Sequence, residues 1–317
     1  MIESNPLRIC VSSCLLGSRV RYDGGHKRNR FVADHLEPFV EWVSVCPEVE
    51  AGLGLPRPAM RLVDDEGTRQ LVEIKERTDH TDALQSAARK RVESLRELDL
   101  SGAILKKDSP SCGLFRVKVY SEGKMPRREG MGLFAEALKE AFPLLPMEDE
   151  GRLNDAGLRE NFIECVFAYR RLCDAFKEGW TPGDIVAFHT AHKLQLSAHS
   201  TVLYNELGRS VAEIKKASRD RFEADYKKSF METMRIAATR GKNANVLNHA
   251  AGHLKHLDSA DRQEVAALTD DYRKGLVPLI VPVTLIRHHA RSGDIRYLNG
   301  QTYLEPHPKE LMLRNHV

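Results

Sequence analysis

The chain has 317 residues, enough for about two domains, and its 42% hydrophobic and 29% charged residues are typical of a globular rather than a disordered protein. A formal net charge of +3 argues against strong polyanion binding by the chain as a whole. No stretch approaches the roughly 20 apolar residues of a membrane span, and the N-terminal residues show no secretory pattern. We therefore expect a cytoplasmic protein without a membrane partner, in which any special cysteine is a ligand or nucleophile rather than half of a disulfide.

Short β-prone runs alternate with helical patterns through the first half of the chain. Residues 81–98 predict an amphipathic helix, and residues 132–142 predict a second helix. Strands interleaved with helices imply a mostly parallel sheet, so we predict an α/β domain over residues 1–148. Ligands then bind beyond the carboxyl ends of its strands. The strand-like runs are residues 7–13, 40–45, 100–105 and 116–120.

The pattern changes to helices from about residue 149. Thr181 and Pro182 form an N-cap and first-position pair, which predicts the start of a long helix running to about residue 210. The apolar segment 276–286 contains two prolines, which weaken a helix prediction there. We predict a mostly α-helical domain over residues 149–317. Its other expected helices cover residues 161–177, 219–238 and 244–257.

Three of the six cysteines lie in turns rich in glycine or proline, each just after a β-like run. Since the carboxyl ends of parallel strands meet at one edge of a sheet, these turns are expected to converge. Three soft thiolates around one point suit an iron–sulfur cluster with one iron left without a protein ligand. The chain lacks the dense cysteine spacing of familiar cluster motifs, so the alternative of small buried hydrophobic cysteines stays open. The three residues are Cys14, Cys46 and Cys112.

Several short strings in the first half resemble the TudS thiouracil desulfidase family, from about residue 5 to residue 145. They are Cys14-Leu-Leu-Gly, Arg21-Tyr-Asp-Gly-Gly, Cys46-Pro-Glu, Pro56-Arg-Pro and the segment from Lys106 to Gly113. The resemblance implies that Cys14, Cys46 and Cys112 hold a 4Fe-4S cluster whose fourth iron is free of protein. In that family, the free iron binds the sulfur of a thiolated pyrimidine, and oxygen replaces the sulfur without redox turnover.

The second half resembles a helical, YbgA-like companion domain often fused to the first. The matching strings begin at Gly151, Leu158, Phe188 and Tyr303. The fused form is similar to RudS-type desulfidases, which convert 4-thiouridine in tRNA to uridine. The resemblance therefore implies tRNA or a thiolated pyrimidine as the partner and substrate.

Replacing sulfur by oxygen requires water to attack the ring carbon, and this attack requires a general base. By resemblance, the catalytic groups are Glu48 and a serine of the Ser109-Pro-Ser111 turn. We prefer Ser109, which is expected to point past the bound ligand. A surface carboxylate and ordinary turn serines are the open alternatives.

Basic residues near the cysteines are candidates for substrate binding. Arg21, Tyr22 and Asp23 lie in a glycine-bearing loop after Cys14 and are expected to hold a base edge or a phosphate, with a solvated loop as the alternative. Lys106 is assigned to the same task, and its charge is expected to lower the pKa of the neighbouring thiols.

Charge is divided unevenly along the chain. Residues 151–317 hold 25 Lys and Arg against 20 Asp and Glu, a net charge of +5, whereas residues 1–150 have a net charge of −2. A basic stretch in this half predicts RNA contacts, with a solvated face as the alternative. Three histidines share a helix face there, for which packing in the core is favoured over zinc binding. The predicted RNA-binding residues are Lys215, Lys216, Lys227 and Lys228, and the histidines are His189, His192 and His199.

Three hypotheses follow from these patterns. The first is an iron–sulfur desulfidase that acts on thiolated uridine in tRNA. The second is the same chemistry on free thiouracil or a thionucleoside, with the helical domain serving oligomerisation. The third is a cluster-bearing redox sensor that binds nucleic acid without turnover.

Overall fold

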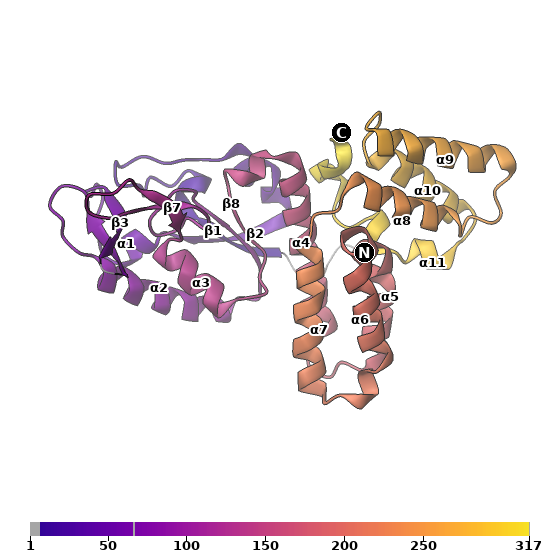
Figure 1. Cartoon of the computed structure of the whole chain (residues 1–317), viewed down its shortest axis with the longest axis horizontal. Coiled ribbons are helices and arrows are strands. Elements are labelled where there is room, and N and C mark those ends of the chain that lie inside the picture. The colour runs from indigo at the N-terminus through magenta and orange to yellow at the C-terminus, as the bar shows by residue number, and fades with distance from the viewer. Residues whose placement is uncertain (1–6, 66, 317) are drawn as a thin grey trace. The chain divides into compact units, whose positions relative to one another are not determined.

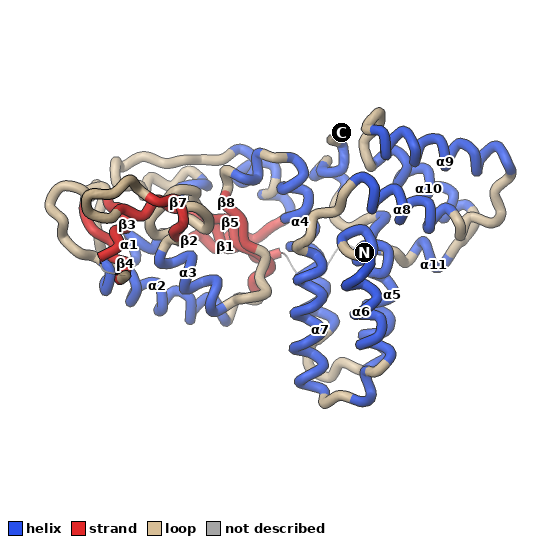
Figure 2. The backbone as a smooth tube through the Cα atoms, in the orientation of Figure 1, coloured by secondary structure: helices blue, strands red, loops and turns tan. Residues whose placement is uncertain are grey.

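Strands and helices separate into two units in the computed structural model, which describes residues 7–65 and 67–316. The chain divides after Asn154 (Figure 1). The first unit contains every strand of the described residues, and the second is built of helices (Figure 2). This arrangement confirms the predicted fold class of an α/β region followed by a helical region.

The first unit is organised around a parallel four-stranded sheet in the order β2-β1-β5-β8. The central strand β5 is buried along its whole length. Three of its strands were predicted nearly to the residue, whereas the three-residue β8 was missed. The strands are β1 (Leu7–Ser12), β2 (Val40–Val45), β5 (Leu100–Leu105) and β8 (Met147–Asp149).

Helices α2 (Thr81–Arg96) and α3 (Leu133–Ala141) belong to the same unit and pack against each other. The predicted apolar stripe of α2 is buried, which confirms its amphipathic pattern. A short helix, α1 (Pro47–Glu50), follows β2 directly. The buried residues of the α2 stripe are Leu84, Ala88, Val92 and Leu95.

A second sheet, in the order β4-β3-β6-β7, was largely missed by the sequence analysis. Strands β3 and β4 form an antiparallel hairpin, β3 pairs with β6 in parallel, and β6 pairs with β7 antiparallel. In β3 and β4 only two adjacent apolar residues are buried in each strand, Leu62 and Val63 in β3 and Leu71 and Val72 in β4, so the apolar signal of each strand is thin. The strands are β3 (Met60–Asp65), β4 (Thr68–Glu73), β6 (Val117–Tyr120) and β7 (Arg127–Gly130).

The second unit consists of helices joined by short turns. The predicted start at Thr181 is confirmed, because its hydroxyl and the Asp184 side chain form a reciprocal capping box. The helices are α4 (Ala156–Ala175), α5 (Pro182–His199), α6 (Thr201–Ala212), α7 (Arg219–Met234), α8 (Arg240–Ala251), α9 (Ser259–Lys274), α10 (Ile280–Ser292) and α11 (Arg296–Asn299).

Two predictions in this unit need correction. The long helix expected to run to residue 210 is broken at Ser200, whose backbone is extended and whose hydroxyl accepts the Leu203 N–H to cap α6. The segment after residue 276 does form a helix, α10. Pro282 lies in its first turn, where a missing N–H costs no intrahelical hydrogen bond.

Candidate active site

The three cysteine turns meet at the carboxyl edge of the parallel sheet. Cys14 lies in a 3-10 turn directly after β1, Cys46 follows β2, and Cys112 lies in the loop between β5 and β6. Strands β2, β1 and β5 are neighbours, so the turns lie side by side. The thiols interact electrostatically with one another, and all three are free.

Burial dominates the electrostatics of these thiols. It raises the pKa of Cys14 to about 11, even though the Lys106 ammonium acts in the opposite direction. Burial likewise raises the pKa of Cys46 and of Cys112. The lowering expected from the lysine charge is therefore wrong, because the desolvation of the thiols outweighs it.

Glu48 lies at the centre of a hydrogen-bonded group beside the cysteines. Its Oε1 accepts the Ser111 hydroxyl at 2.5 Å, and its Oε2 accepts the Arg57 Nε–H at 2.9 Å. The Arg57 side chain is 3% exposed and that of Glu48 is 13% exposed, so the pair is largely shielded from water. Arg57 was not predicted as a site residue, and the Pro-Arg-Pro string that contains it was the one signal for it in the sequence.

The two serines of the turn have different partners. The Ser109 Oγ accepts the backbone N–H groups of Ser111 and Cys112 at 3.3 and 3.1 Å, as a turn serine does. It also lies 3.0 Å from the Ser111 Oγ. Ser109 is the serine preferred from the sequence, but the structure places Ser111 in contact with Glu48.

Of the predicted substrate-binding residues in the loop after Cys14, Tyr22 is exposed to solvent, whereas Arg21 and Asp23 contact each other. Tyr22 is 43% exposed, with the Arg21 guanidinium 5.3 Å from its ring centroid. Asp23 accepts the Gly25 N–H at 3.0 Å and pairs with Arg21 at 3.5 Å, which stabilises the loop. This loop is tied to the Glu48 group, because the backbone N–H of Arg57 donates to the Tyr22 carbonyl at 3.0 Å.

Lys106, the fourth predicted substrate-binding residue, is held within the fold. Its ammonium forms an ion pair with Glu150 and donates to the Lys107 carbonyl at 2.9 Å. Glu150 also accepts the Lys107 backbone N–H at 2.5 Å. The sequence analysis did not identify Glu150, because the pairing joins loops more than 40 residues apart.

The donor set at this edge is made of thiols. Across residues 7–65 and 67–316, no three His, Cys, Asp or Glu side chains are grouped so as to hold one metal ion. In a 4Fe-4S cluster each thiolate would bind a different iron, so the thiolates stand further apart than the ligands of a single ion. Three free thiols on three loops, two of them buried and that of Cys46 half-buried, are therefore compatible with an iron–sulfur cluster.

The histidines of α5 are core residues, as the sequence analysis favoured. The Nδ1 atom of His189 lies 3.0 Å from the Tyr226 hydroxyl, and that of His192 lies 2.8 Å from the Phe188 carbonyl. The Nδ1 of His199 lies 2.6 Å from a backbone carbonyl of the turn after α7. Each ring is buried and hydrogen-bonded within the helical unit.

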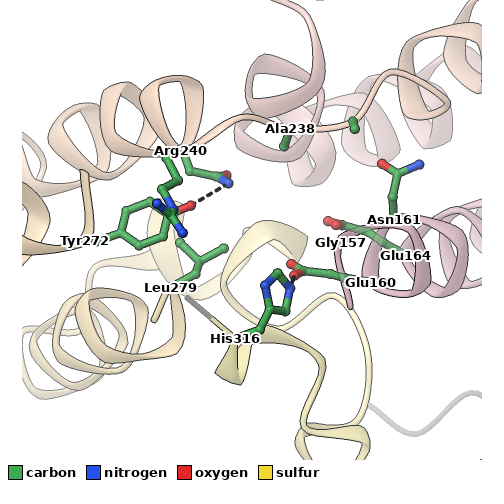
Figure 3. A pocket seen from close by; sticks show the side chains of 11 residues that line it. Gly157, Glu160, Asn161, Glu164, Ala238, Arg240, Tyr272, Leu279 and His316 are labelled. Carbon is green, nitrogen blue, oxygen red and sulfur yellow. Dashed lines mark hydrogen bonds and ion pairs between the residues drawn. The ribbon is translucent and has the colours of Figure 1, made fainter. Parts of the chain in front are cut away.

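A pocket of about 180 Å³ lies in the helical unit (Figure 3). Glu160 and Glu164 face it from α4, but both carboxylates already have partners. Glu160 lies 2.7 Å from the His316 ring, Glu164 accepts from Gln195 at 2.8 Å, and Arg314 pairs with both at 3.4 and 3.3 Å. These acids fasten the segment around Arg314 to α4, and we assign the pocket no ligand.

The four lysines predicted to contact RNA do not form a uniform set. Lys227 is half-buried, with its Nζ 2.5 Å from Glu223 and 5.1 Å from the Phe176 ring centroid. It therefore covers the aromatic core between α4 and α7. The other three are exposed, two of them in the turn between α6 and α7; they are Lys215, Lys216 and Lys228.

Two family models match the chain, one in each half. Residues 9–150 match the 2-thiouracil desulfurase family, and residues 193–308 match a protein of unknown function, DUF1722. No helix among the described residues is both long and apolar enough to cross a membrane.

Individual relatives match half of the chain each. The uncharacterized protein YbgA of Escherichia coli (strain K12) is 34% identical over 152 residues, which cover 47% of this chain and 90% of the relative. The uncharacterized protein YbbK of Bacillus subtilis (strain 168) is 32% identical over 154 residues, which cover 46% of this chain and 98% of the relative. A solved structure described as the 4Fe-4S-dependent thiouracil desulfidase TudS is 29% identical, covers 47% of this chain and 93% of that chain, and has a TM-score of 0.38.

Proposed function

The chain belongs to the 2-thiouracil desulfurase family through residues 9–150, and on this premise we propose that it replaces the sulfur of a thiolated uridine by oxygen, with 4-thiouridine in tRNA as its substrate. The observation that carries the proposal is the meeting of three cysteine turns beside the hydrogen-bonded pair of Glu48 and Ser111. Soft ligands and a carboxylate base at one sheet edge are what a desulfidase requires.

We assign the protein ligands of a 4Fe-4S cluster to Cys14, Cys46 and Cys112. The fit rests on the donor chemistry, because the three free thiols are buried or half-buried, mutually coupled and joined to neighbouring strand ends. When bound, the cluster supplies a soft Lewis acid for a thiocarbonyl sulfur, through an iron that has no protein ligand.

The chain's own residues supply the proton transfer. Glu48 takes a proton from the attacking water at its Oε1, the oxygen that now accepts the Ser111 hydroxyl. Ser111, between Glu48 and Ser109, orients that water by its hydroxyl. The water oxygen bonds to the ring carbon and the carbon–sulfur bond breaks. The sulfur leaves as hydrogen sulfide with both protons of the water, one of them returned by Glu48. The exchange is a hydrolysis, so it needs no oxidant or reductant.

The helical unit is proposed to bind the phosphates of tRNA. Support comes from the net charge of +5 over residues 151–317 and from the exposed basic turn between α6 and α7. We place the contacts at the exposed Lys215, Lys216 and Lys228 and leave out Lys227, because its side chain is half-buried over the Phe176 ring. A base within a folded tRNA must also be exposed to reach the sheet edge.

The test is turnover by the full chain after anaerobic reconstitution with iron and sulfide. Bulk tRNA that contains 4-thiouridine is incubated with the protein, and the loss of 4-thiouridine absorbance is followed, with free 2-thiouracil in parallel. We expect loss of sulfur from tRNA and release of hydrogen sulfide. Turnover of free 2-thiouracil alone contradicts the tRNA assignment, and turnover of neither by cluster-loaded protein contradicts the desulfidase assignment.

A further inference from the structure

The guanidinium of Arg57 is fixed on all sides by the loops around the cysteine turns. Its Nη1 donates to the Gly54 carbonyl at 3.2 Å, and its Nη2 donates to the Val20 carbonyl at 3.0 Å. Its Nε and Nη2 both donate to a single oxygen of Glu48, Oε2. With 3% of the side chain exposed and two main-chain carbonyls as anchors, the planar fork has one orientation.

This arrangement divides the two oxygens of Glu48 between two tasks. Oε2 is occupied by Arg57, so Oε1 alone is turned toward Ser111. A carboxylate without such an anchor rotates about its terminal torsion, which has broad minima. We propose that Arg57 is a positioning residue that aims Oε1 of Glu48 at the attacking water, an inference that rests on the proposed function.

The Arg57 guanidinium also contacts the loop after Cys14, through the Val20 carbonyl. The Val20 carbonyl that binds Arg57 is also 3.8 Å from the Cys46 Sγ. A purely structural role, in which Arg57 only holds this loop and the Gly54 turn, is therefore the competing explanation. The two roles differ in what they do when Glu48 can no longer act as a base.

A double-mutant cycle separates the two roles. Arg57→Met and Arg57→Lys are made alone and in the Glu48→Gln background, and iron content, kcat and KM for 2-thiouracil are measured in the full chain. We expect Arg57→Met to lower kcat about 10- to 100-fold at unchanged KM and iron content, as misplacing a catalytic group does. Arg57→Lys keeps the charge without the fork, so it is expected to restore part of that loss.

In the Glu48→Gln background, Arg57→Met is expected to cause no further loss, because the group it aims has already been disabled. The matched control is Arg91→Met. Arg91 also donates to a backbone carbonyl and pairs with a carboxylate of α1, but that carboxylate is Glu50. Arg91→Met is expected to leave kcat unchanged.

Three results would overturn the positioning role: loss of iron in Arg57→Met, a rise in KM at constant kcat, or an equal fold-loss in both backgrounds. If Arg57→Met does not fold, Arg57→Lys is read in the same cycle, with loss of kcat expected only when Glu48 is present. A parent protein that loads iron but removes sulfur from neither 4-thiouridine in tRNA nor free 2-thiouracil contradicts the proposed function instead, so the two failures are distinguishable.

Discussion

The two units bury residues of the metal-binding kind in opposite ways. In the α/β unit, Cys14, Cys46 and Cys112 come from three loops after neighbouring strands and converge as free thiols. In the helical unit, His189 and His192 lie on one helix face, and each is hydrogen-bonded by its own Nδ1 within the core. Ligand-type residues gathered from several strand ends therefore indicate chemistry, whereas the same kind of residues along one helix indicate packing.

The largest effect is expected from the cysteines. Cys14→Ala, Cys46→Ala and Cys112→Ala should each abolish iron binding and turnover, because a lost thiolate ligand leaves the cluster without its third protein anchor. Iron and sulfide analysis after reconstitution measures the outcome. Cys10→Ala and Cys173→Ala serve as controls and should load iron normally. Normal iron content in Cys112→Ala would remove the cluster assignment.

Glu48→Gln should give the next largest effect. It preserves shape and removes the base, so kcat is expected to fall about 100-fold or more while iron content and the KM for 2-thiouracil stay unchanged. Steady-state kinetics with matched iron loading provide the measurement. A variant with nearly parental kcat would show that another group accepts the proton.

Substitution of the two serines should lower kcat by different amounts, in the order that their hydrogen bonds predict. Ser111→Ala removes the only hydroxyl in contact with Glu48 in this turn, so its kcat should fall more than that of Ser109→Ala. Ser109→Ala should mainly lower the melting temperature, because its hydroxyl caps two backbone N–H groups. Parallel kinetics and thermal melts decide the order, and a larger kcat loss in Ser109→Ala would restore the preference drawn from the sequence.

Charge reversal on the helical unit should weaken tRNA binding and leave the chemistry intact. The triple variant Lys215→Glu, Lys216→Glu and Lys228→Glu should lose at least about tenfold in tRNA affinity, with a shallower salt dependence. Its turnover of free 2-thiouracil should match the parent.

The matched control reverses three exposed lysines elsewhere in the same unit and so gives the same net charge. Binding isotherms at several salt concentrations compare the two triple variants. Equal weakening by both would mean that only net charge matters, and no weakening by either would place the RNA surface elsewhere. The control positions are Lys255, Lys274 and Lys309.

The smallest expected effect is a pH dependence of stability from the buried histidines. Burial lowers the pKa of His189 to about 4 and that of His192 to about 3, both below the usual value of 6.5. The unfolded chain therefore binds more protons below pH 6.5, and these histidines should lower stability as the pH falls from 6.5 toward 4. Replacing both by Gln should flatten the fall in melting temperature between pH 7 and pH 5. An unchanged slope would show that other groups cause it.

Residues 7–12, 40–45 and 100–105 could be assigned as strands because their apolar runs are short and bounded by turn residues. The convergence of the cysteines could be predicted from the same strand assignments, because the carboxyl ends of parallel strands lie at one edge of the sheet. The β3–β4 hairpin could not be found in this way. Each strand buries only a pair of adjacent apolar residues, and charged residues next to these pairs keep the apolar runs too short to stand out.

The contacts of the site depend on tertiary packing, which no local pattern encodes. Glu48 and Ser111 are 63 residues apart, and their hydrogen bond exists only because β2 and β5 flank the same strand. Arg57 belongs to a motif that the sequence shows, but its burial against Glu48 could not be predicted from that motif. Lys227 looked like its neighbours along the helix, and only the aromatic ring beneath it shows that it is not a surface charge.

The central claim is that three cysteines hold a cluster with one iron left open for sulfur. Mössbauer spectroscopy of the full chain, reconstituted with isotopically enriched iron, tests it directly when spectra are compared with and without 2-thiouracil. We predict that one iron in four has a distinct signal and that this signal alone changes when 2-thiouracil binds. Spectra in which all irons are equivalent and unaffected by 2-thiouracil, or a protein that binds no iron, would contradict the account.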